Sequence, residues 1–139
     1  MQDYEETMLE YETTIPAADE PSSMAVISPA QHAVLDYLVA GAFITAGLAF
    51  LPRHKPAATL AFLNGAMVLG MSMLTDYPGG VRRTLSFKGH RTGDMIQAAL
   101  AGLGPALFGF AQDPEAKYFY GQAASEVGVI AATDWDQAQ

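Results

Sequence analysis

Cysteine is absent from the sequence, which excludes disulfides, thiolate metal sites and thiol catalysis. Charge is scarce: only 16% of the residues are Asp, Glu, Lys or Arg, against about 25% in ordinary soluble domains. Lys and Arg are missing altogether before Arg53. Also missing are a phosphate-binding glycine loop and the Gly-x-Ser-x-Gly and His-Glu-x-x-His motifs of hydrolases. We therefore predict that the protein is not an enzyme.

The acidic residues are concentrated at the N-terminus, where seven of the fifteen Asp and Glu lie within the first twenty residues. The net charge of −8 therefore mainly describes this segment. Residues 1–27 show no sustained apolar periodicity, so we expect an acidic, disordered tail. Such a tail argues against nucleic acid as a partner and leaves a cytoplasmic protein as the candidate partner of residues 1–27.

Four apolar stretches follow the tail, at residues 33–51, 57–74, 95–110 and 118–132. The first two are apolar on all sides, and nineteen helical residues cover about 28 Å, enough to cross the hydrocarbon core of a membrane. The segment Ser28-Pro29-Ala30-Gln31 is a capping-box pattern that predicts the start of the first helix. We predict an all-α fold, a four-helix transmembrane bundle, although the fourth stretch is the weakest.

The chain also repeats itself at an offset of 58 residues. The matching pairs are Ser28 and Ser86, His32 and His90, Asp36 and Asp94, Phe50 and Phe108, Pro56 and Pro114, Gly70 and Gly128, Thr75 and Thr133, and Asp76 and Asp134. We predict two parallel two-helix repeats at 28–77 and 86–135, joined by 78–85 and followed by a short tail at 136–139.

Small residues recur at helical spacing within this repeat, as Ala66-x-x-x-Gly70 and Ala124-x-x-x-Gly128. Small residues four apart let helices approach closely in lipid. We therefore predict that these four residues pack the second helix against the fourth.

Polar residues recur as well. His32 and Asp36 are four residues apart and share a helix face, as do His90 and Asp94. Asp76 and Asp134 follow at helix ends, so all six residues are predicted at one face of the membrane. Because the set is duplicated, we interpret it as a structural polar cluster. The alternative is a metal or proton site with His32 and His90 as candidate ligands; we assign no metal or cofactor at this stage.

Glu126 breaks the repeat, since position 68 is Val. A carboxylate inside a membrane span indicates a functional site by default. The competing interpretation is a fourth helix that is peripheral or wetter than the others. Glu126 is the candidate functional carboxylate of this sequence.

Residues at the ends of the apolar stretches indicate where the protein lies in the cell and how it is oriented in the membrane. Tyr77, Tyr118, Phe119, Tyr120 and Trp135 lie at span ends, where aromatic residues anchor a protein at the membrane interface. Four Lys and Arg lie on the side of the termini and three on the other. The positive-inside rule then predicts a multi-pass protein of the bacterial inner membrane with both termini in the cytoplasm.

The segment Gly104-Pro105-Ala106-Leu107-Phe108-Gly109-Phe110, with His-x-x-x-Asp upstream, resembles the SPW-repeat family of small bacterial membrane proteins. Gly104-Pro105-Ala106 stands where that family has Ser-Pro-Trp, and the resemblance covers about residues 28–135. It implies two-helix repeats and an integral membrane location, without an established activity or cofactor.

Three functions are compatible with these patterns. We favour a non-enzymatic accessory or scaffold subunit whose partners are other integral membrane proteins and the lipid bilayer. The alternatives are a small proton-linked transporter that uses Glu126 and the His/Asp cluster, and a metal- or haem-binding redox protein with His32 and His90 as ligands.

Overall fold

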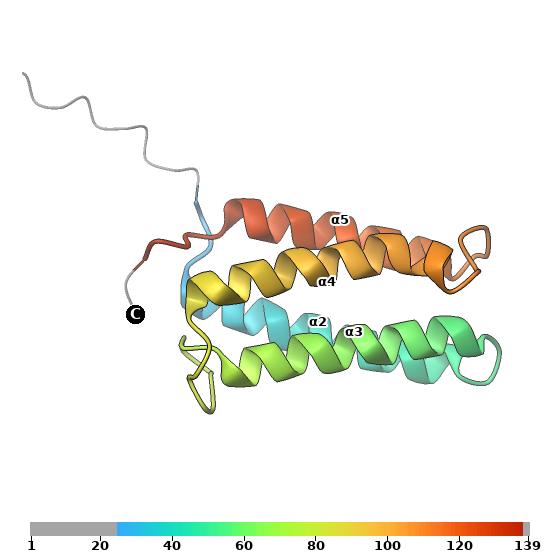
Figure 1. Ribbon diagram of the computed structural model, residues 1–139, viewed down its shortest axis with the longest axis horizontal. Helices are drawn as coiled ribbons and strands as arrows, with labels where there is room; N and C mark the ends of the chain where they lie inside the picture. Colours follow the sequence, from blue (N-terminus) through green and yellow to red (C-terminus); the bar gives the residue numbers. More distant parts are fainter. Residues whose placement is uncertain (1–24, 138–139) are drawn as a thin grey trace, which may run out of the picture.

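A computed structural model describes residues 25–137 and contains four helices in that range (Figure 1). They are α2 (Pro29–Phe50), α3 (Lys55–Leu74), α4 (Phe87–Leu107) and α5 (Ala116–Ala132). The all-α, four-helix prediction is confirmed at this level. Most of the predicted acidic tail and the last two residues of the predicted C-terminal tail lie outside the described residues.

Local sequence explains where the helices begin. The Ser28 side chain accepts a hydrogen bond from the Gln31 amide at 3.3 Å, and the Gln31 side chain accepts one from the Ser28 amide at 2.9 Å. This reciprocal pair is the predicted capping box. Ser86 caps α4 in the same place by accepting from the Gly89 amide at 3.0 Å. The start of each helical hairpin is therefore fixed within a few residues of the His/Asp pairs.

The helices form two hairpins, α2 with α3 and α4 with α5, which join mainly through α3 and α4. Figure 1 shows the two hairpin loops together at one end of the bundle and the beginnings of α2 and α4 at the other. Glycine allows the close approaches: a Cβ at Gly65 would lie 3.3 Å from the Ala40 carbonyl oxygen, and one at Gly104 would lie 2.5 Å from Leu60. The Pro105 ring is accommodated within α4.

Two short backbone pairings close the end of the bundle at which α2 and α4 begin. The Asp76 amide donates to the Leu85 carbonyl at 2.7 Å, and the Asp134 amide donates to the Ile27 carbonyl at 2.9 Å. Each hairpin is thus tied, just before its first helix, to the end of the other hairpin. These contacts hold the residues that follow α3 and α5 over the starts of α2 and α4.

The predicted packing through small residues is wrong within this chain. Ala66, Ala124 and Gly128 are exposed, and a Cβ at Gly70 or Gly128 would meet no neighbour within 4 Å. The principal helix contacts do not include α3 with α5. The large buried side chains of each helix decide which face turns inward, and these small residues lie on the opposite face.

Aromatic side chains form much of the interior rather than an interfacial belt. Phe43 and Phe119, both fully buried, pack at 6.3 Å between ring centroids in the cluster near the hairpin loops. A second cluster near the other end contains Tyr77 and Trp135, which are 1% and 8% exposed. The prediction of surface anchors is therefore wrong for Tyr77, Phe119 and Trp135, whereas Tyr120 is 41% exposed.

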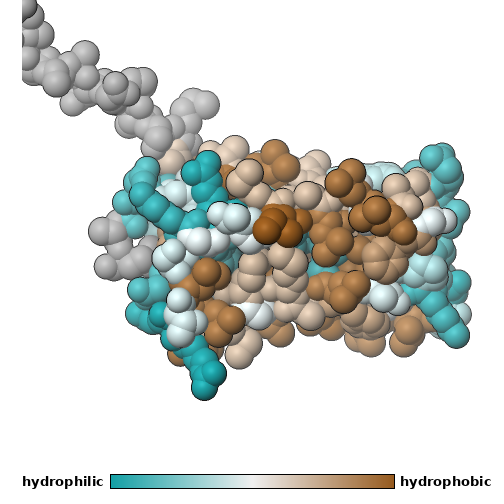
Figure 2. Space-filling view, in the orientation of Figure 1, coloured by the Kyte–Doolittle hydropathy of each residue, from teal (hydrophilic) through white to brown (hydrophobic). Residues whose placement is uncertain are grey.

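The outer surface is largely apolar between two polar ends. Figure 2 shows a hydrophobic band across the middle of this face and hydrophilic residues at both ends. Two helices, α2 and α3, are long and apolar enough to cross a membrane. Large exposed apolar residues nevertheless occur on all four helices, including Val34, Leu38, Leu48, Leu63, Met95, Ile96, Leu103, Leu107 and Val127. An apolar surface this widespread is unusual for a monomer in water.

The two hairpin loops are linked by His54. Its Nδ1 accepts from the Ala57 amide at 3.1 Å and so caps α3, while its Nε2 lies 3.0 Å from an Asp113 oxygen. The hydrogen bond with the Asp113 carboxylate raises the pKa of His54 above its ordinary value of 6.5. An ionised partner favours the protonated ring.

We therefore expect Asp113→Asn to lower the pKa of His54, because the negative charge that favours imidazolium is removed. NMR titration of the His54 ring in detergent micelles measures this. Asp136→Asn, at the opposite end of the bundle, is the control and should leave the titration of His54 unchanged. An unchanged His54 pKa in Asp113→Asn would contradict the contact.

Candidate metal centre

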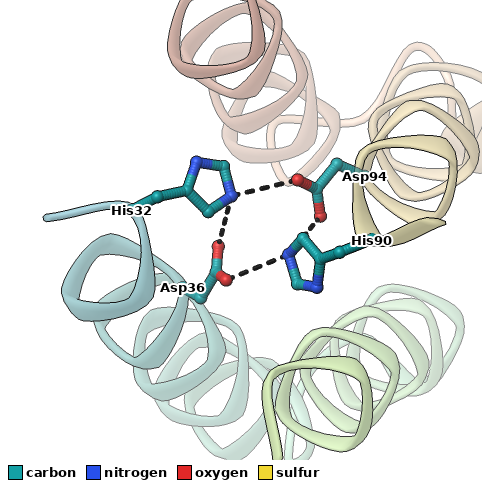
Figure 3. A group of neighbouring side chains, drawn as sticks. All are labelled: His32, Asp36, His90 and Asp94. Carbon is teal, nitrogen blue, oxygen red and sulfur yellow. Dashed lines mark hydrogen bonds and ion pairs between the residues drawn. The ribbon is translucent and has the colours of Figure 1, made fainter. Parts of the chain in front are cut away.

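Four of the predicted polar residues converge between α2 and α4. The His32 Nε2 atom lies 3.3 Å from Asp36 Oδ1 and 3.1 Å from Asp94 Oδ2. The His90 Nε2 atom lies 3.1 Å from Asp36 Oδ2 and 3.0 Å from Asp94 Oδ1. Figure 3 shows the resulting closed ring, in which both imidazoles turn Nε2 toward both carboxylates. We call these four residues the His/Asp quartet.

The other ring nitrogen of each histidine is held by a threonine. His90 Nδ1 lies 2.7 Å from Thr75 Oγ1, and His32 Nδ1 lies 2.8 Å from Thr133 Oγ1. Each hydroxyl donates its only hydrogen to a main-chain carbonyl, Thr75 to Met71 and Thr133 to Val129, both at 2.7 Å. Each threonine oxygen must therefore accept from the ring. We assign the proton of both neutral imidazoles to Nδ1 on this network.

In the neutral rings this assignment leaves a lone pair on both Nε2 atoms, facing carboxylate oxygens at 3.0–3.3 Å. Of these four contacts, that of His32 Nε2 with Asp94 Oδ2, at 3.1 Å, has the geometry of a hydrogen bond. Lone pairs and negative charges at that distance repel unless a cation lies among them. A proton on His90 Nε2 would form no well-aligned hydrogen bond, because neither nearby carboxylate oxygen is in line with it. Within the described residues, His90 Nε2 has no hydrogen-bond partner. A metal ion among the four side chains would satisfy all of the groups at once.

The quartet also meets the other requirements of a metal centre. One ligand atom from each residue lies within 4.8 Å of the other three. Imidazole and carboxylate together suit zinc, iron and manganese. Hydrogen bonds from the distal ring nitrogen, such as those to Thr75 and Thr133, typically orient histidine ligands. The site is enclosed, since His32, Asp36, His90 and Asp94 are at most 8% exposed.

The two carboxylates are supported differently. Asp36 Oδ2 accepts a hydrogen bond from the Tyr77 hydroxyl at 2.8 Å, and the Ser72 hydroxyl, which donates to the Val68 carbonyl at 2.7 Å, lies 3.4 Å away. The positions that correspond to Tyr77 and Ser72 in the second half are Trp135 and Ile130, and the Trp135 ring nitrogen donates to the Ile130 carbonyl instead. Both aspartates interact with the two histidines, and Asp36 has the Tyr77 hydroxyl as a further partner.

The remaining two residues of the predicted cluster lie outside it. Asp76 is exposed and lies 3.8 Å from Arg83, and Asp134 accepts from the Asp136 amide at the surface. The chain is extended after α3 and α5, so successive side chains point in opposite directions. Thr75 and Thr133 turn inward and the aspartates that follow them turn outward. The prediction placed the right segments at the site but chose the wrong residue in each.

Glu126 lies on the interior face of α5, beside the quartet. It is 8% exposed, and neither of its carboxylate oxygens has a hydrogen-bond partner in the described chain. It lines a cavity of about 30 Å³ that also touches His32, Asp36 and Asp94. The structure thus places the predicted functional carboxylate next to three of the four quartet residues.

Sequence reasoning overlooked the threonines and Tyr77 as site residues. The signal was present for the threonines, since Thr75 and Thr133 recur at the same offset as the histidines. Nothing in the sequence showed that Tyr77, interpreted as a membrane anchor, would reach Asp36. The pairing of each histidine with a threonine from the end of a different helix is visible only in three dimensions.

The resemblance to the SPW-repeat family stays a prediction, and no relative supplies a ligand or an activity for the quartet. Comparisons with protein-family models, with curated proteins and with solved structures give no match to this chain.

Proposed function

We propose that the protein is a small membrane protein that binds one divalent transition-metal ion at the His/Asp quartet. One observation carries this proposal: both histidines are held as Nδ1–H tautomers by Thr75 and Thr133, while both Nε2 atoms face carboxylates. A metal ion is the cation that accepts two nitrogen and two carboxylate ligands together.

Charge balance supports the proposal. Two buried carboxylates carry two negative charges, which a divalent ion cancels. Buried charges without compensation cost several kcal/mol each, so an interior with two close carboxylates needs cations nearby. The competing arrangement is two imidazolium rings with two carboxylates, which is the structural polar cluster that the duplication first suggested. It is also neutral, and His32 Nε2 has Asp94 Oδ2 as an acceptor at 3.1 Å, but a proton on His90 Nε2 would be in line with neither of the two carboxylate oxygens near it.

The setting that we propose is the one expected from the sequence: a multi-pass bundle of two parallel repeats in a bacterial inner membrane, with cytoplasmic termini. The apolar residues exposed on all four helices support lipid as the surrounding medium. Equivalent contacts at the offset of 58 residues, such as His32 with Thr133 and His90 with Thr75, support the repeat.

An accessory role within a larger membrane complex is compatible with a metal centre and is our second candidate. The outward position of Ala66, Ala124 and Gly128 favours it, since small exposed residues let another transmembrane helix approach closely.

Among redox cofactors, a single metal ion fits the His/Asp quartet better than haem. Carboxylate oxygens within 3.3 Å of both Nε2 atoms occupy the space that a macrocycle between His32 and His90 would need.

Metal analysis of the purified protein tests the proposal. After loading with Zn²⁺ or Mn²⁺ in detergent and removal of free ion, the wild type should retain about one ion per chain, as a structural site does. His32→Ala and His90→Ala should retain none. His54→Ala, which removes the remaining histidine at the other end of the bundle, is the matched control and should bind like the wild type.

The threonines provide a second test of the same site. Thr75→Val and Thr133→Val should weaken metal binding by about 10- to 100-fold, because they free the Nδ1–H groups that orient the rings. Thr75→Ser and Thr133→Ser keep the hydroxyl and should bind nearly as well as the wild type. Thr84→Val, in the loop after α3, is the control. A wild type that retains no stoichiometric metal after loading would refute the proposal.

A further inference from the structure

The quartet does not account for Glu126. This carboxylate is more than nine-tenths buried, its two oxygens have no hydrogen-bond partner in the described chain, and it lines the cavity beside the quartet. A buried carboxylate without a hydrogen-bond donor costs free energy, and a donor in the cavity would remove that cost. The unsatisfied oxygens therefore point to a ligand in the cavity.

The size of the cavity limits that ligand. Its volume of about 30 Å³ exceeds the roughly 10–15 Å³ that one water molecule needs, and an organic substrate would not fit. The cavity lies between the quartet and α5, because its walls include Asp36 and Asp94 on one side and Ser125 and Glu126 on the other. A ligand of the size of water in this cavity would lie between the quartet and Glu126.

Apart from the quartet residues, the polar residues of the cavity wall all come from the second half of the chain. Residues that correspond across the two halves line it together, Val39 with Gln97 and Val68 with Glu126. In both pairs the first-half residue is apolar and the second-half residue is polar. The Gln97 side chain donates to Asn64 Oδ1 at 2.9 Å, which fixes its position. A water molecule in the cavity therefore has hydrogen-bonding groups of α4 and α5 beside it, in addition to those of the quartet.

We propose that this cavity holds a water-sized oxygen ligand that binds the metal ion of the quartet and donates a hydrogen bond to Glu126. The inference rests on the proposed metal site and adds an open coordination position to it. The water is a fifth ligand beside the four protein ligands, and an exchangeable ligand position is what distinguishes a reactive metal centre from a closed structural one. Glu126 is then a positioning residue: it holds the water and does not bind the metal.

The experiment uses the full-length protein loaded with Mn²⁺ in detergent and transferred to deuterated water. Electron–nuclear double resonance detects the strongly coupled deuterons of a water molecule bound directly to Mn²⁺. The wild type should show them. Glu126→Val, which places at 126 the residue that stands at 68, should keep the metal stoichiometry and lose the signal. Glu126→Gln should retain it, because the amide oxygen also accepts a hydrogen bond.

Should Glu126→Val not yield folded protein, Glu126→Ala serves in its place with the same expected loss. Bound Mn²⁺ without strongly coupled deuterons in the wild type would overturn the inference and leave the metal site intact. So would an undiminished signal in both Glu126→Val and Glu126→Ala. Absence of stoichiometric Mn²⁺ from the wild type is a different result, because it refutes the proposed metal site and the bound water falls with it.

Discussion

Replacement of His90 by alanine is expected to lower the free energy of unfolding by about 3–5 kcal/mol, the usual cost of leaving a buried charge without compensation. His90 is fully buried, and its Nε2 atom lies within 3.1 Å of one oxygen of Asp36 and one of Asp94. Without the ring, two carboxylates face each other in the interior with one histidine and no complete metal site. Denaturant unfolding in detergent micelles measures the loss.

His54→Ala is the control for this prediction, since it removes a histidine and a helix cap at the other end of the bundle. Loss of an N-cap costs about 1 kcal/mol, so the two variants should differ clearly. Adding Asp36→Asn to His90→Ala should restore part of the lost stability, because it removes one of the two opposed charges. Equal destabilisation by His90→Ala and His54→Ala would show that the two carboxylates of the quartet do not repel each other strongly when His90 is absent.

Metal removal is expected to have the second large effect. A ligand that binds only the folded state stabilises it by about 4 kcal/mol when its free concentration is a thousandfold above its dissociation constant. Addition of a strong chelator should therefore lower the melting temperature of the wild type, and restoring excess Zn²⁺ or Mn²⁺ should reverse the change. Thermal melting followed by circular dichroism measures both steps.

His32→Ala, which lacks one ligand, should melt at the same temperature with and without chelator. This variant separates loss of the bound ion from a general effect of the chelator on micelles. A wild type whose melting is indifferent to chelator and metal would favour the ionic alternative, in which two imidazolium rings balance Asp36 and Asp94. The His/Asp quartet would then be the structural polar cluster that its duplication suggested.

The sequence predicted much of the site because the relevant patterns are local. Residues four apart share a helix face, so the pairing of His32 with Asp36 and of His90 with Asp94 required no tertiary information. The match at 58 residues then implied that the two pairs occupy comparable places. It could not show that the pairs face each other, because that depends on the rotation of α2 and α4 about their own axes.

The site and packing residues that were predicted wrongly lie just after helix ends or on the outer faces of helices, where the direction of a side chain depends on tertiary packing. Asp76 and Asp134 were assigned to the cluster because they recur, but an extended segment alternates the direction of its side chains, and the threonines are the residues that point inward. Ala124 and Gly128 were assigned to the interior because small residues permit close packing. They lie outside, since larger side chains such as Phe119 fill the interior of the bundle.

Local sequence patterns are sufficient to predict that this chain forms apolar helices, where the first helix is capped, and which polar residues lie on the helices. These properties depend on backbone hydrogen bonding and on helical periodicity within a few residues. Helix packing in three dimensions is what brings His32, Asp36, His90 and Asp94 into one ring and places Thr75 and Thr133 against the histidine rings. It also decided that Glu126 lines the adjoining cavity. These relations join atoms from different helices, and the packing of the interior fixes them.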